Sequence, residues 1–400
     1  MPIVAVFVDG LKPESLEHME FLNTLYHVRV KTELGAYSPV CHTSIYTGVF
    51  PNKHLCWFTW KYSPESSPFQ ILNRIGVSHF PHNIYSQYLC YKICLMRSDA
   101  ANPFIFGFSV FTEIPMKYWC YFDTDIKRPF TEPNFYNRYP NLFELLRLNE
   151  VKYEVIGTTK RDQPFSSESV KKHELKKDIV FTLYFIGDID PLSHSFCQDS
   201  EVCVKRLKLI DKIMEEKYRD SQKIFKSFYF IVFSDHGHSE VKNTINLREI
   251  FRRRNRDLAR YIHFTDSNYA RFWFRNSKEE EDVRKVLYEL EEDGLGFILT
   301  EKHFNRYHVD MPDNRYGDII FYLDKPNVFM GKEISALGKK VERPVSMHGY
   351  LPDYPDSDGV FISNMRLKKD RMILQDIAPS ILQALGLETP KYIDGEPVWK

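Results

Sequence analysis

Residues 230–238 read Phe-Ile-Val-Phe-Ser-Asp-His-Gly-His, and this stretch points both to the fold class and to a metal site. The first four residues are apolar, as in a strand buried on both faces of a parallel sheet. The strand delivers Asp235 and His236 side by side at its carboxyl end, and Gly237 allows close approach of a neighbouring group. Because carboxylate oxygen and imidazole nitrogen are ligands of Zn²⁺, we expect a metal ion at this strand end.

Apolar runs of strand length recur along the chain with helical patterns between them. The runs occupy residues 3–8, 151–157, 178–186, 227–234 and 318–323. Apolar residues at three- and four-residue spacing predict helices over 142–148, 201–217, 279–292 and 376–385. This alternation predicts a doubly wound α/β fold, with helices on both faces of a mainly parallel central sheet. Such sheets bind ligands beyond the carboxyl ends of their strands, where Asp9, Asp190 and Asp235 are expected.

Length and composition are typical of one large domain. The 400 residues have 43% hydrophobic content and can bury a sizeable core, which suggests one large domain with an insertion or two domains; we expect a single domain over 1–400. Residues 55–140 interrupt the alternation with a dense set of aromatic residues and are interpreted as an insertion. Residues 255–345 are a candidate second insertion. The aromatic insertion is either a small aromatic-cored subdomain or a lid whose rings line a leaving-group pocket.

Charge and cysteine content exclude some classes of protein. Lys plus Arg and Asp plus Glu number 54 each, so no net field favours a nucleic acid polymer or an anionic membrane, and recognition must be local. The seven cysteines form an odd set without zinc-ribbon spacing, which favours reduced thiols and a cytoplasmic protein. The most apolar long window, 104–122, contains charged residues and a proline, so no transmembrane segment is expected. The pattern does not predict an oligomeric state.

Two further stretches carry reactive groups near the N-terminus. Asp9 directly follows the run 3–8 and precedes Gly10, which places a carboxylate at a strand tip; an ordinary Asp-Gly turn is the alternative. Ser38 begins a loop that runs into a short helix. A serine at a helix N-terminus gains from the positive end of the dipole, which favours an alkoxide or a phosphate, and an N-cap is the alternative.

The remaining metal-ligand candidates lie further along the chain. Asp190 and His194 are four residues apart after the run 178–186, so both can reach one ion, and this spacing favours Asp190 over Asp188. His348 lies in a His-Gly pair and is a candidate for one more ligand. Three carboxylates, three imidazoles and a hydroxyl suit two divalent metal ions, with zinc preferred, and indicate an enzyme that acts on phosphate esters.

The order of these motifs resembles the nucleotide pyrophosphatase/phosphodiesterase branch of the alkaline phosphatase superfamily. Asp9-Gly10 resembles its first metal motif, and residues 38–54 resemble its nucleophile motif. The later matches, in the family's order, are 190–194, 234–237, 348–350, Asp356 and the terminal helix with Gly386. The resemblance covers the chain apart from the two insertions and implies an alkaline phosphatase-like fold.

The resemblance also implies a function and a role for each residue. The protein would be a two-zinc hydrolase of phosphodiester or pyrophosphate bonds that works through a phosphoserine intermediate. One zinc would be held by Asp190, His194 and His348. The other would be held by Asp9, Asp235 and His236, with Ser38 as a further ligand and as the nucleophile. The substrate would be a small-molecule phosphate ester, nucleotide-like or linked to a sugar or lipid.

Four positions need separate interpretation. The diesterase branch usually carries Thr in place of Ser38 and, in place of Cys41, an Asn that holds a phosphate oxygen. A thiol is a poor donor, so Cys41 puts the usual binding of a diester in question. Lys12, where the family commonly has Arg, would contact phosphate or lie on the surface. His238 would support the metal ligands or be an ordinary loop residue.

Other chemistries fit the same residues. A phosphomonoesterase, a mutase or a phosphotransferase acting on a sugar, glycan or lipid phosphate would use the same metal-bound serine. A sulfatase is disfavoured, because Ser38 is followed by Pro39 with no arginine near it. A non-catalytic binding protein would lack a ligand or the nucleophile, and the sequence retains all of them.

Overall fold

A computed structural model of the chain describes residues 1–76, 83–96, 111, 114–128, 130–132, 138–157, 166–330 and 343–399. The chain forms two compact units, and each is built from segments that are separate in sequence. Unit 1 comprises Met1–His54, Pro129–Ser239 and Val345–Lys400, and unit 2 comprises Leu55–Arg128 and Glu240–Pro344. The predicted ranges 55–140 and 255–345 overlap the two segments of unit 2. The description of 1–400 as one domain with two insertions stays a prediction.

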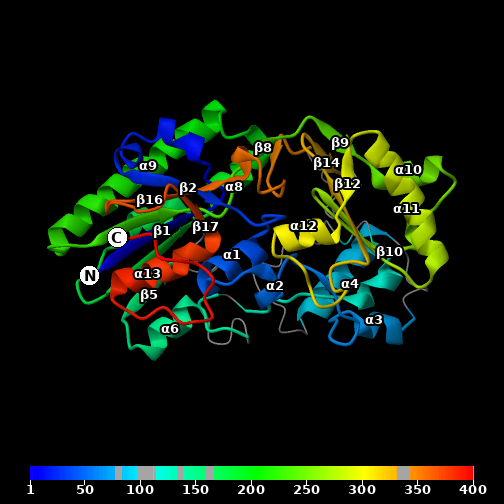
Figure 1. Ribbon diagram of the computed structural model, residues 1–400, viewed down its shortest axis with the longest axis horizontal. Helices are drawn as coiled ribbons and strands as arrows, with labels where there is room; N and C mark the ends of the chain where they lie inside the picture. Colours follow the sequence, from blue (N-terminus) through cyan, green and yellow to red (C-terminus); the bar gives the residue numbers. More distant parts are fainter. Residues whose placement is uncertain are drawn as a thin grey trace. The chain divides into compact units, whose positions relative to one another are not determined.

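Unit 1 is built on a seven-stranded sheet with the order β17-β2-β16-β7-β1-β6-β5 (Figure 1). Its strands are β1 (Ile3–Val8), β2 (Tyr26–Lys31), β5 (Tyr153–Ile156), β6 (Phe181–Ile186), β7 (Tyr229–Phe233), β16 (Gly359–Ser363) and β17 (Arg371–Ile373). Only β16 is antiparallel to its neighbours, β2 and β7, among these strands. The sheet is therefore mainly parallel, and the predicted α/β class is confirmed.

Strand β1 lies at the centre of the parallel part of the sheet. All six of its residues are buried, which explains why its sequence is apolar at every position rather than at every second one. Its register pairs Ile3 with Phe181 of β6 on one side and with Tyr229 of β7 on the other. Because β1, β6 and β7 run in the same direction, their carboxyl ends meet at one edge of the sheet.

Helices cover both faces of the sheet. On one face, Val4 and Val6 of β1 belong to the same core cluster as Leu207 and Ile210 of α9 (Glu201–Ile224). On the other face, the ring of Phe7 meets His42 of α1 (Ser38–Thr47), with ring centroids 5.2 Å apart. The other helices of unit 1 are α2 (Pro51–His54), α6 (Leu142–Leu148), α7 (Ser167–Lys172), α8 (Ile189–Phe196) and α13 (Ile377–Leu385).

Unit 2 contains an antiparallel sheet with the order β10-β11-β13-β12. Its strands are β10 (Ile262–Asp266), β11 (Tyr269–Trp273), β12 (Gly296–Ile298) and β13 (Ile319–Leu323), and its helices are α3 (Gln70–Arg74), α4 (Ile84–Met96), α10 (Leu247–Arg253), α11 (Ser277–Glu292) and α12 (Glu301–Arg306). The expectation that residues 318–323 join the parallel sheet is wrong. An apolar run fixes a buried strand but not the sheet that the strand joins.

Aromatic rings form the core of unit 2. Trp57, Trp60 and Trp119 are at most 1% exposed, and the ring of Trp60 packs edge-on against Phe111 with centroids 4.6 Å apart. Trp60 and Trp119 are therefore core residues, and Trp57, although buried, borders a pocket together with Phe304 and Tyr316.

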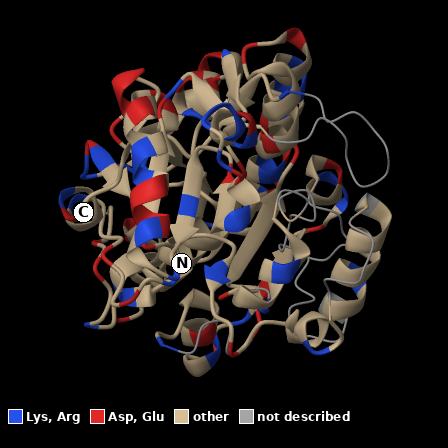
Figure 2. Ribbon diagram, turned by 90° about the vertical axis from the view of Figure 1, so that its right-hand side faces the viewer, with Lys and Arg blue, Asp and Glu red and all other residues tan. Residues whose placement is uncertain are grey.

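None of the described helices is both long enough and apolar enough to cross a membrane. All seven cysteines lie among the described residues and are free thiols; the cytoplasmic location stays a prediction. Figure 2 shows acidic and basic residues interspersed among the elements, in keeping with the equal numbers of the two charges, 54 each.

Candidate metal centre and active site

The carboxyl ends of three parallel strands deliver most of the candidate ligands in unit 1. Asp9 follows β1, and its backbone N–H donates to Ile186 O at the end of β6, 2.9 Å away. Asp235 and His236 follow β7, separated from it by Ser234. Asp190 and His194 lie on α8, which begins shortly after β6, and His348 follows the short strand β15 (Ser346–Met347). Five of the six predicted ligands thus follow parallel strands of this sheet, and His348 follows β15, which pairs with β8 (Ser239–Glu240) in a separate two-stranded sheet.

These six residues form two groups whose ligand atoms lie close enough to hold a metal ion. Asp190, His194 and His348 form one group, and Asp9, Asp235 and His236 form the other. Within each group the candidate ligand atoms lie within 4.8 Å of one another. The two groups have the same membership as the two predicted ligand sets.

Asp190 anchors the first group. Its Oδ1 lies 3.3 Å from His194 Nε2 and 3.9 Å from His348 Nε2. His194 Nδ1 lies 3.0 Å from the carbonyl oxygen of Ser346, so Nδ1 carries a proton and donates it. An imidazole whose Nδ1–H is bound to a backbone carbonyl presents Nε2 as its ligand atom, which is a common arrangement in metal sites.

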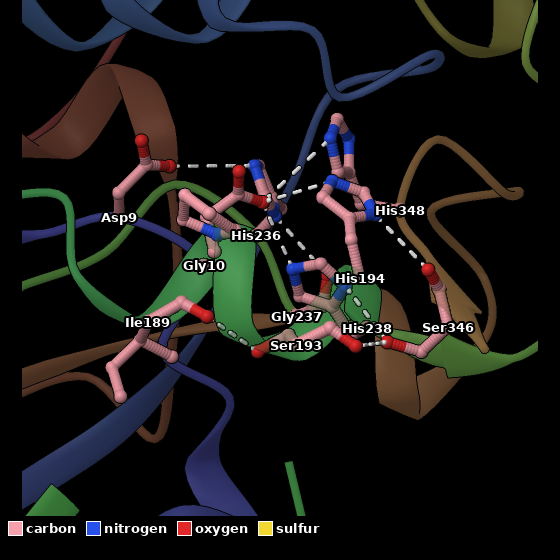
Figure 3. A network of polar contacts seen from close by, with 12 residues as sticks. Asp9, Gly10, Ile189, Ser193, His194, His236, Gly237, His238, Ser346 and His348 are labelled. Carbon is pink, nitrogen blue, oxygen red and sulfur yellow. Dashed lines mark hydrogen bonds and ion pairs between the residues drawn. The ribbon is translucent and has the colours of Figure 1, made fainter. Parts of the chain in front are cut away.

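His236 anchors the second group. Its Nε2 lies 3.7 Å from Asp9 Oδ1 and 3.5 Å from Asp235 Oδ2. Its Nδ1 lies 3.1 Å from the carbonyl oxygen of Gly237 and donates to it, so Nε2 again faces the carboxylates. Figure 3 shows Asp9 joined to His236 by a dashed line, with His194, His238 and His348 gathered beside them.

His238 belongs to the centre as well. Its Nε2 lies 3.0 Å from Asp190 Oδ1, and Asp190, His236 and His238 form a third group of potential ligands. Ser346 Oγ donates its proton to Ser193 O at 2.6 Å, so it accepts from His238 Nδ1, which is 3.3 Å away. In the neutral imidazole, Nε2 then has a lone pair facing a carboxylate oxygen. The lone pair of His238 Nε2 and the oxygen of Asp190 repel each other. A proton on Nε2, or a metal ion bound by both atoms, would make their contact favourable.

Burial and mutual repulsion set the charges of the carboxylates. Burial, with Asp235 and Asp190 nearby, raises the pKa of Asp9 well above its usual value. Burial also raises the pKa of Asp235, to about 7. For Asp190 burial acts in the same direction, but hydrogen bonds to His194 and His238 outweigh it and hold the pKa well below its usual value.

The imidazoles are held mainly in the neutral form that binds metals. Burial lowers the pKa of His236 to about 3, and burial together with His236 lowers the pKa of His348 well below its usual value. The rings of His236 and His348 stack with centroids 4.0 Å apart, and two positively charged rings would repel each other at this distance. His194 is the exception, because its bonds to Asp190 outweigh burial and raise its pKa.

Several buried atoms of the centre have no hydrogen-bond partner among the described residues. They are Asp9 Oδ1, Asp235 Oδ2 and His348 Nδ1. Leaving buried acceptors unpaired is costly, and buried carboxylates of like charge repel one another. Divalent cations would satisfy these carboxylate oxygens and neutralise the charge. The donor set of carboxylates and imidazoles therefore fits metal ions, and mixed nitrogen and oxygen donors suit zinc.

Two glycines allow the backbone to pass close to the centre. Gly10 has a φ of +68°, and a Cβ there would lie 3.0 Å from His238 Nε2. A Cβ on Gly237 would lie 2.4 Å from the carbonyl oxygen of Asp356. The predicted role of Gly237 in close approach is confirmed, and the contact is with backbone.

The predicted nucleophile lies at the start of a helix. Ser38 is the first residue of α1, and Tyr37 is the N-cap, so the alternative that Ser38 caps the helix is wrong. The ring of Tyr37 lies edge-on to His348 with centroids 6.2 Å apart. The N-terminus of α1, where positive charge gathers, is therefore next to the metal-ligand cluster.

Cys41 lies one turn further along α1 and is fully buried. Its Sγ is 3.8 Å from Thr32 Oγ1. Burial, with Asp235 and Glu33 nearby, raises the pKa of the Cys41 thiol well above its usual value, so the thiol stays neutral. Close to Asp235, this side chain offers a phosphate group only a weak S–H donor.

Two polar residues near the centre have structural partners. Lys12 Nζ pairs with Asp199 Oδ1 at 2.9 Å, and its side chain is only 12% exposed, so Lys12 neither lies fully on the surface nor pairs with the candidate ligands. Asp188 accepts from Ser167 Oγ at 2.5 Å and from Arg206 at 3.1 Å. Asp188 thus has partners of its own, whereas Asp190 lies among the candidate ligands.

Ser346 was missed in the sequence. Its carbonyl oxygen binds His194, and its hydroxyl contacts His238 and Ser193. A serine two residues before a histidine carries no signal of such a role, because the contact depends on segments 108 and 152 residues apart in sequence.

A mainly parallel α/β sheet with aspartates and histidines gathered at its strand ends defines the alkaline phosphatase-like class of hydrolases. Within this class, the chain belongs to the type I phosphodiesterase/nucleotide pyrophosphatase family, whose model matches residues 3–351. The resemblance drawn from the motifs is confirmed, and the protein is a hydrolase of this family. No curated protein matches the sequence.

Solved structures share the fold. Human ectonucleotide pyrophosphatase/phosphodiesterase 5 has a TM-score of 0.67 and 15% identity, covering 99% of this chain and 97% of that one. The murine protein has a TM-score of 0.65 and 15% identity, covering 98% of this chain and 96% of that one. An inactive variant of the murine protein, in complex with AMP, has the same TM-score, identity and coverage. At this identity the likeness shows the fold.

Proposed function

We propose that the enzyme is a two-zinc hydrolase that cleaves phosphodiester or pyrophosphate bonds in a nucleotide-like substrate through a phosphoserine on Ser38. The observation that carries the proposal is the pair of ligand groups, one around Asp190 and one around His236, at one edge of the sheet. The AMP complex of the inactive murine variant supports a nucleotide-like substrate. Zinc ions bound there would lower the pKa of a hydroxyl group and stabilise charge on phosphoryl oxygens.

Each candidate residue would have a defined role in this reaction. Asp190, His194 and His348 would hold one ion, and Asp9, Asp235 and His236 the other, with Ser38 as an added ligand. Gly237 O and Ser346 O accept from Nδ1 of His236 and His194, which would hold the two Nε2 atoms in place as metal ligands before substrate binds. The N-terminus of α1 favours the negative charge of both the serine alkoxide and the phosphate.

The reaction would proceed in two displacements at phosphorus. Ser38 loses its hydroxyl proton to solvent and forms an Oγ–P bond as the bond to the leaving oxygen breaks, and the leaving group takes up a proton. Water then attacks the phosphoserine, the Oγ–P bond breaks and Ser38 regains a proton. The products are an alcohol or phosphate leaving group and a phosphate monoester.

A second candidate is favoured by one observation at Cys41. The buried thiol stands where the diesterases of this family usually present an Asn to a non-bridging phosphate oxygen. A phosphomonoesterase, a mutase or a phosphotransferase acting on a sugar, glycan or lipid phosphate would bind phosphate with a different set of donors. The metal ligands are compatible with either chemistry.

The test is hydrolysis of bis-p-nitrophenyl phosphate and of p-nitrophenyl phosphate by the zinc-loaded enzyme. We expect the diester to be preferred, Ser38→Ala to abolish turnover with zinc still bound, and Ser38→Thr to retain activity. Preference for the monoester would favour the second candidate. Turnover that survives Ser38→Ala would contradict the phosphoserine mechanism.

A further inference from the structure

Two helices of unit 2 share one part of the aromatic core. Leu72 of α3 and Cys90 and Tyr91 of α4 belong to the same buried cluster. Phe69, which precedes α3, stacks on Tyr91 with ring centroids 5.9 Å apart. The inner sides of α3 and α4 therefore pack against the core of their own unit.

The outer sides of the same helices are apolar as well. Six large hydrophobic residues there are between 36% and 69% exposed, namely Ile71, Ile75, Tyr85, Tyr88, Leu89 and Ile93. On α4 these residues recur at three- and four-residue spacing, so they lie along one side of the helix. We call these six exposed side chains together the α3–α4 apolar face.

Helix α11 of the same unit shows how unusual this face is. Its buried side carries Val283, Val286, Leu287 and Leu290, and charged residues dominate the rest of the helix. Helix α4, by contrast, has one charged residue, Lys92, in 13 residues. A helix that is apolar on both its inner and its outer side is typical of a surface that binds something else.

The charged residues of α3 and α4 themselves are positive. Arg74 of α3 and Lys92 of α4 are exposed, and neither helix contains an aspartate or a glutamate. Lys92 Nζ lies 5.6 Å from the centroid of the Tyr88 ring, so the cation borders the apolar residues. Whereas the whole chain has no net charge, this face combines large apolar side chains with local positive charge.

We propose that the α3–α4 apolar face binds the surface of a bilayer that contains anionic lipids. Tyrosine, leucine and isoleucine would insert at the boundary between head groups and acyl chains, and Arg74 and Lys92 would contact lipid phosphates. A second copy of the chain is a poorer occupant. A two-fold contact through this face would place the cations of both copies in one interface, with no acidic residue on α3 or α4 to pair with them.

Vesicle flotation of the full chain tests the proposal. We expect the protein to float with vesicles of phosphatidylcholine and phosphatidylserine, and less with phosphatidylcholine alone. The double variant Leu89→Ser/Ile93→Ser should lose about a hundredfold in partitioning, because burial of each side chain is worth about a factor of ten. Arg74→Glu/Lys92→Glu should lose the preference for the anionic vesicles.

The matched control is Leu148→Ser, which removes a leucine that is 74% exposed on α6 of unit 1 and should float like the wild type. All substituted side chains are exposed, so melting temperatures should agree and exclude misfolding as a cause. Absence of flotation with both vesicles, or equal losses in the control, would overturn the proposal. So would a wild-type dimer that becomes monomeric in Leu89→Ser/Ile93→Ser without any vesicle binding, because the face would then join two copies.

Discussion

His238 Nε2 and Asp190 Oδ1 lie 3.0 Å apart, across 48 residues of sequence, and this contact ties two parts of the ligand cluster together. Asp190 belongs to the group with His194 and His348 and also to the group with His236 and His238. His236 in turn belongs to the group with Asp9 and Asp235. The cluster is therefore continuous, and a change at one residue should be felt at its neighbours.

Removing His238 should weaken metal binding. Without its contact, Asp190 loses one of the two histidines that hold its carboxylate in place. We expect His238→Ala to lower zinc affinity by roughly 10- to 100-fold, the usual effect of losing a residue that supports a metal ligand. Competition with a chromophoric chelator measures the change. His27→Ala, at an exposed position on β2, is the control and should bind zinc as the wild type does; equal affinities in all three proteins would remove His238 from the centre.

A methyl group at Gly10 should damage both stability and metal binding. The φ of +68° costs about 1–2 kcal/mol for a residue other than glycine, and the new Cβ would press on His238 and on Asp190. Gly386→Ala is a matched control, since Gly386 has a φ of +77° with nothing within 4 Å of a Cβ. We expect thermal unfolding to show a loss in both variants and zinc titration to show a loss only in Gly10→Ala. Unimpaired zinc binding in Gly10→Ala would contradict the packing described at the centre.

Replacing Cys41 by Asn should shift substrate preference towards diesters. The amide supplies a donor to a phosphate oxygen that the neutral thiol supplies only weakly. A hydrogen bond to a charged group is worth about 1.5–3 kcal/mol, so the ratio of kcat/KM for diester over monoester should rise about tenfold or more. A ratio that stays constant would show that position 41 does not contact substrate.

Glu33 should make the stability of the protein depend on pH. Burial raises its pKa from 4.5 to about 7, against hydrogen bonds from Ser44 and Gln375 that lower it. The folded state thus binds more protons than the unfolded state between pH 4.5 and about 7, so the contribution of Glu33 to stability is fully present below pH 4.5 and is lost as pH rises to 7.

Glu33→Gln cannot titrate, so it should gain stability relative to the wild type over this window, by roughly 3 kcal/mol in total. Denaturant unfolding at several pH values measures the difference between the two proteins. The glutamine also changes the hydrogen bonds at the site, but that offset does not vary with pH. If the difference in unfolding free energy between Glu33→Gln and the wild type did not change between pH 4.5 and 7, the raised pKa of Glu33 would be refuted.

The sequence predicted the parts of the fold whose residues are uniformly apolar. Strands β1, β6 and β7 could be found because burial on both faces makes nearly every position apolar, with Thr182 of β6 as an exception. Strand β2 (Tyr26–Lys31) was missed, because the polar residues His27, Arg29 and Lys31 occupy every second position and the strand is only partly buried. Strand β16 was missed as well, and its antiparallel direction depends on contacts with β2 and β7 that no local pattern encodes.

At the site, the sequence predicted ligands that follow strand ends and missed groups that act through distant contacts. Asp9 and Asp235 follow buried runs, and the topology of a parallel sheet brings such positions together. Lys12 could not be placed from its neighbours in sequence, because its partner Asp199 lies on a segment 187 residues away. Ser346 was invisible for the same reason.

Zinc titration of chelator-treated protein tests the central claim, a two-metal centre, most directly. We predict about two ions per chain in the wild type and about one in each of Asp190→Asn and Asp235→Asn, because each substitution weakens a different ligand group. Binding of no zinc by the wild type, or the same stoichiometry in all three proteins, would contradict the account.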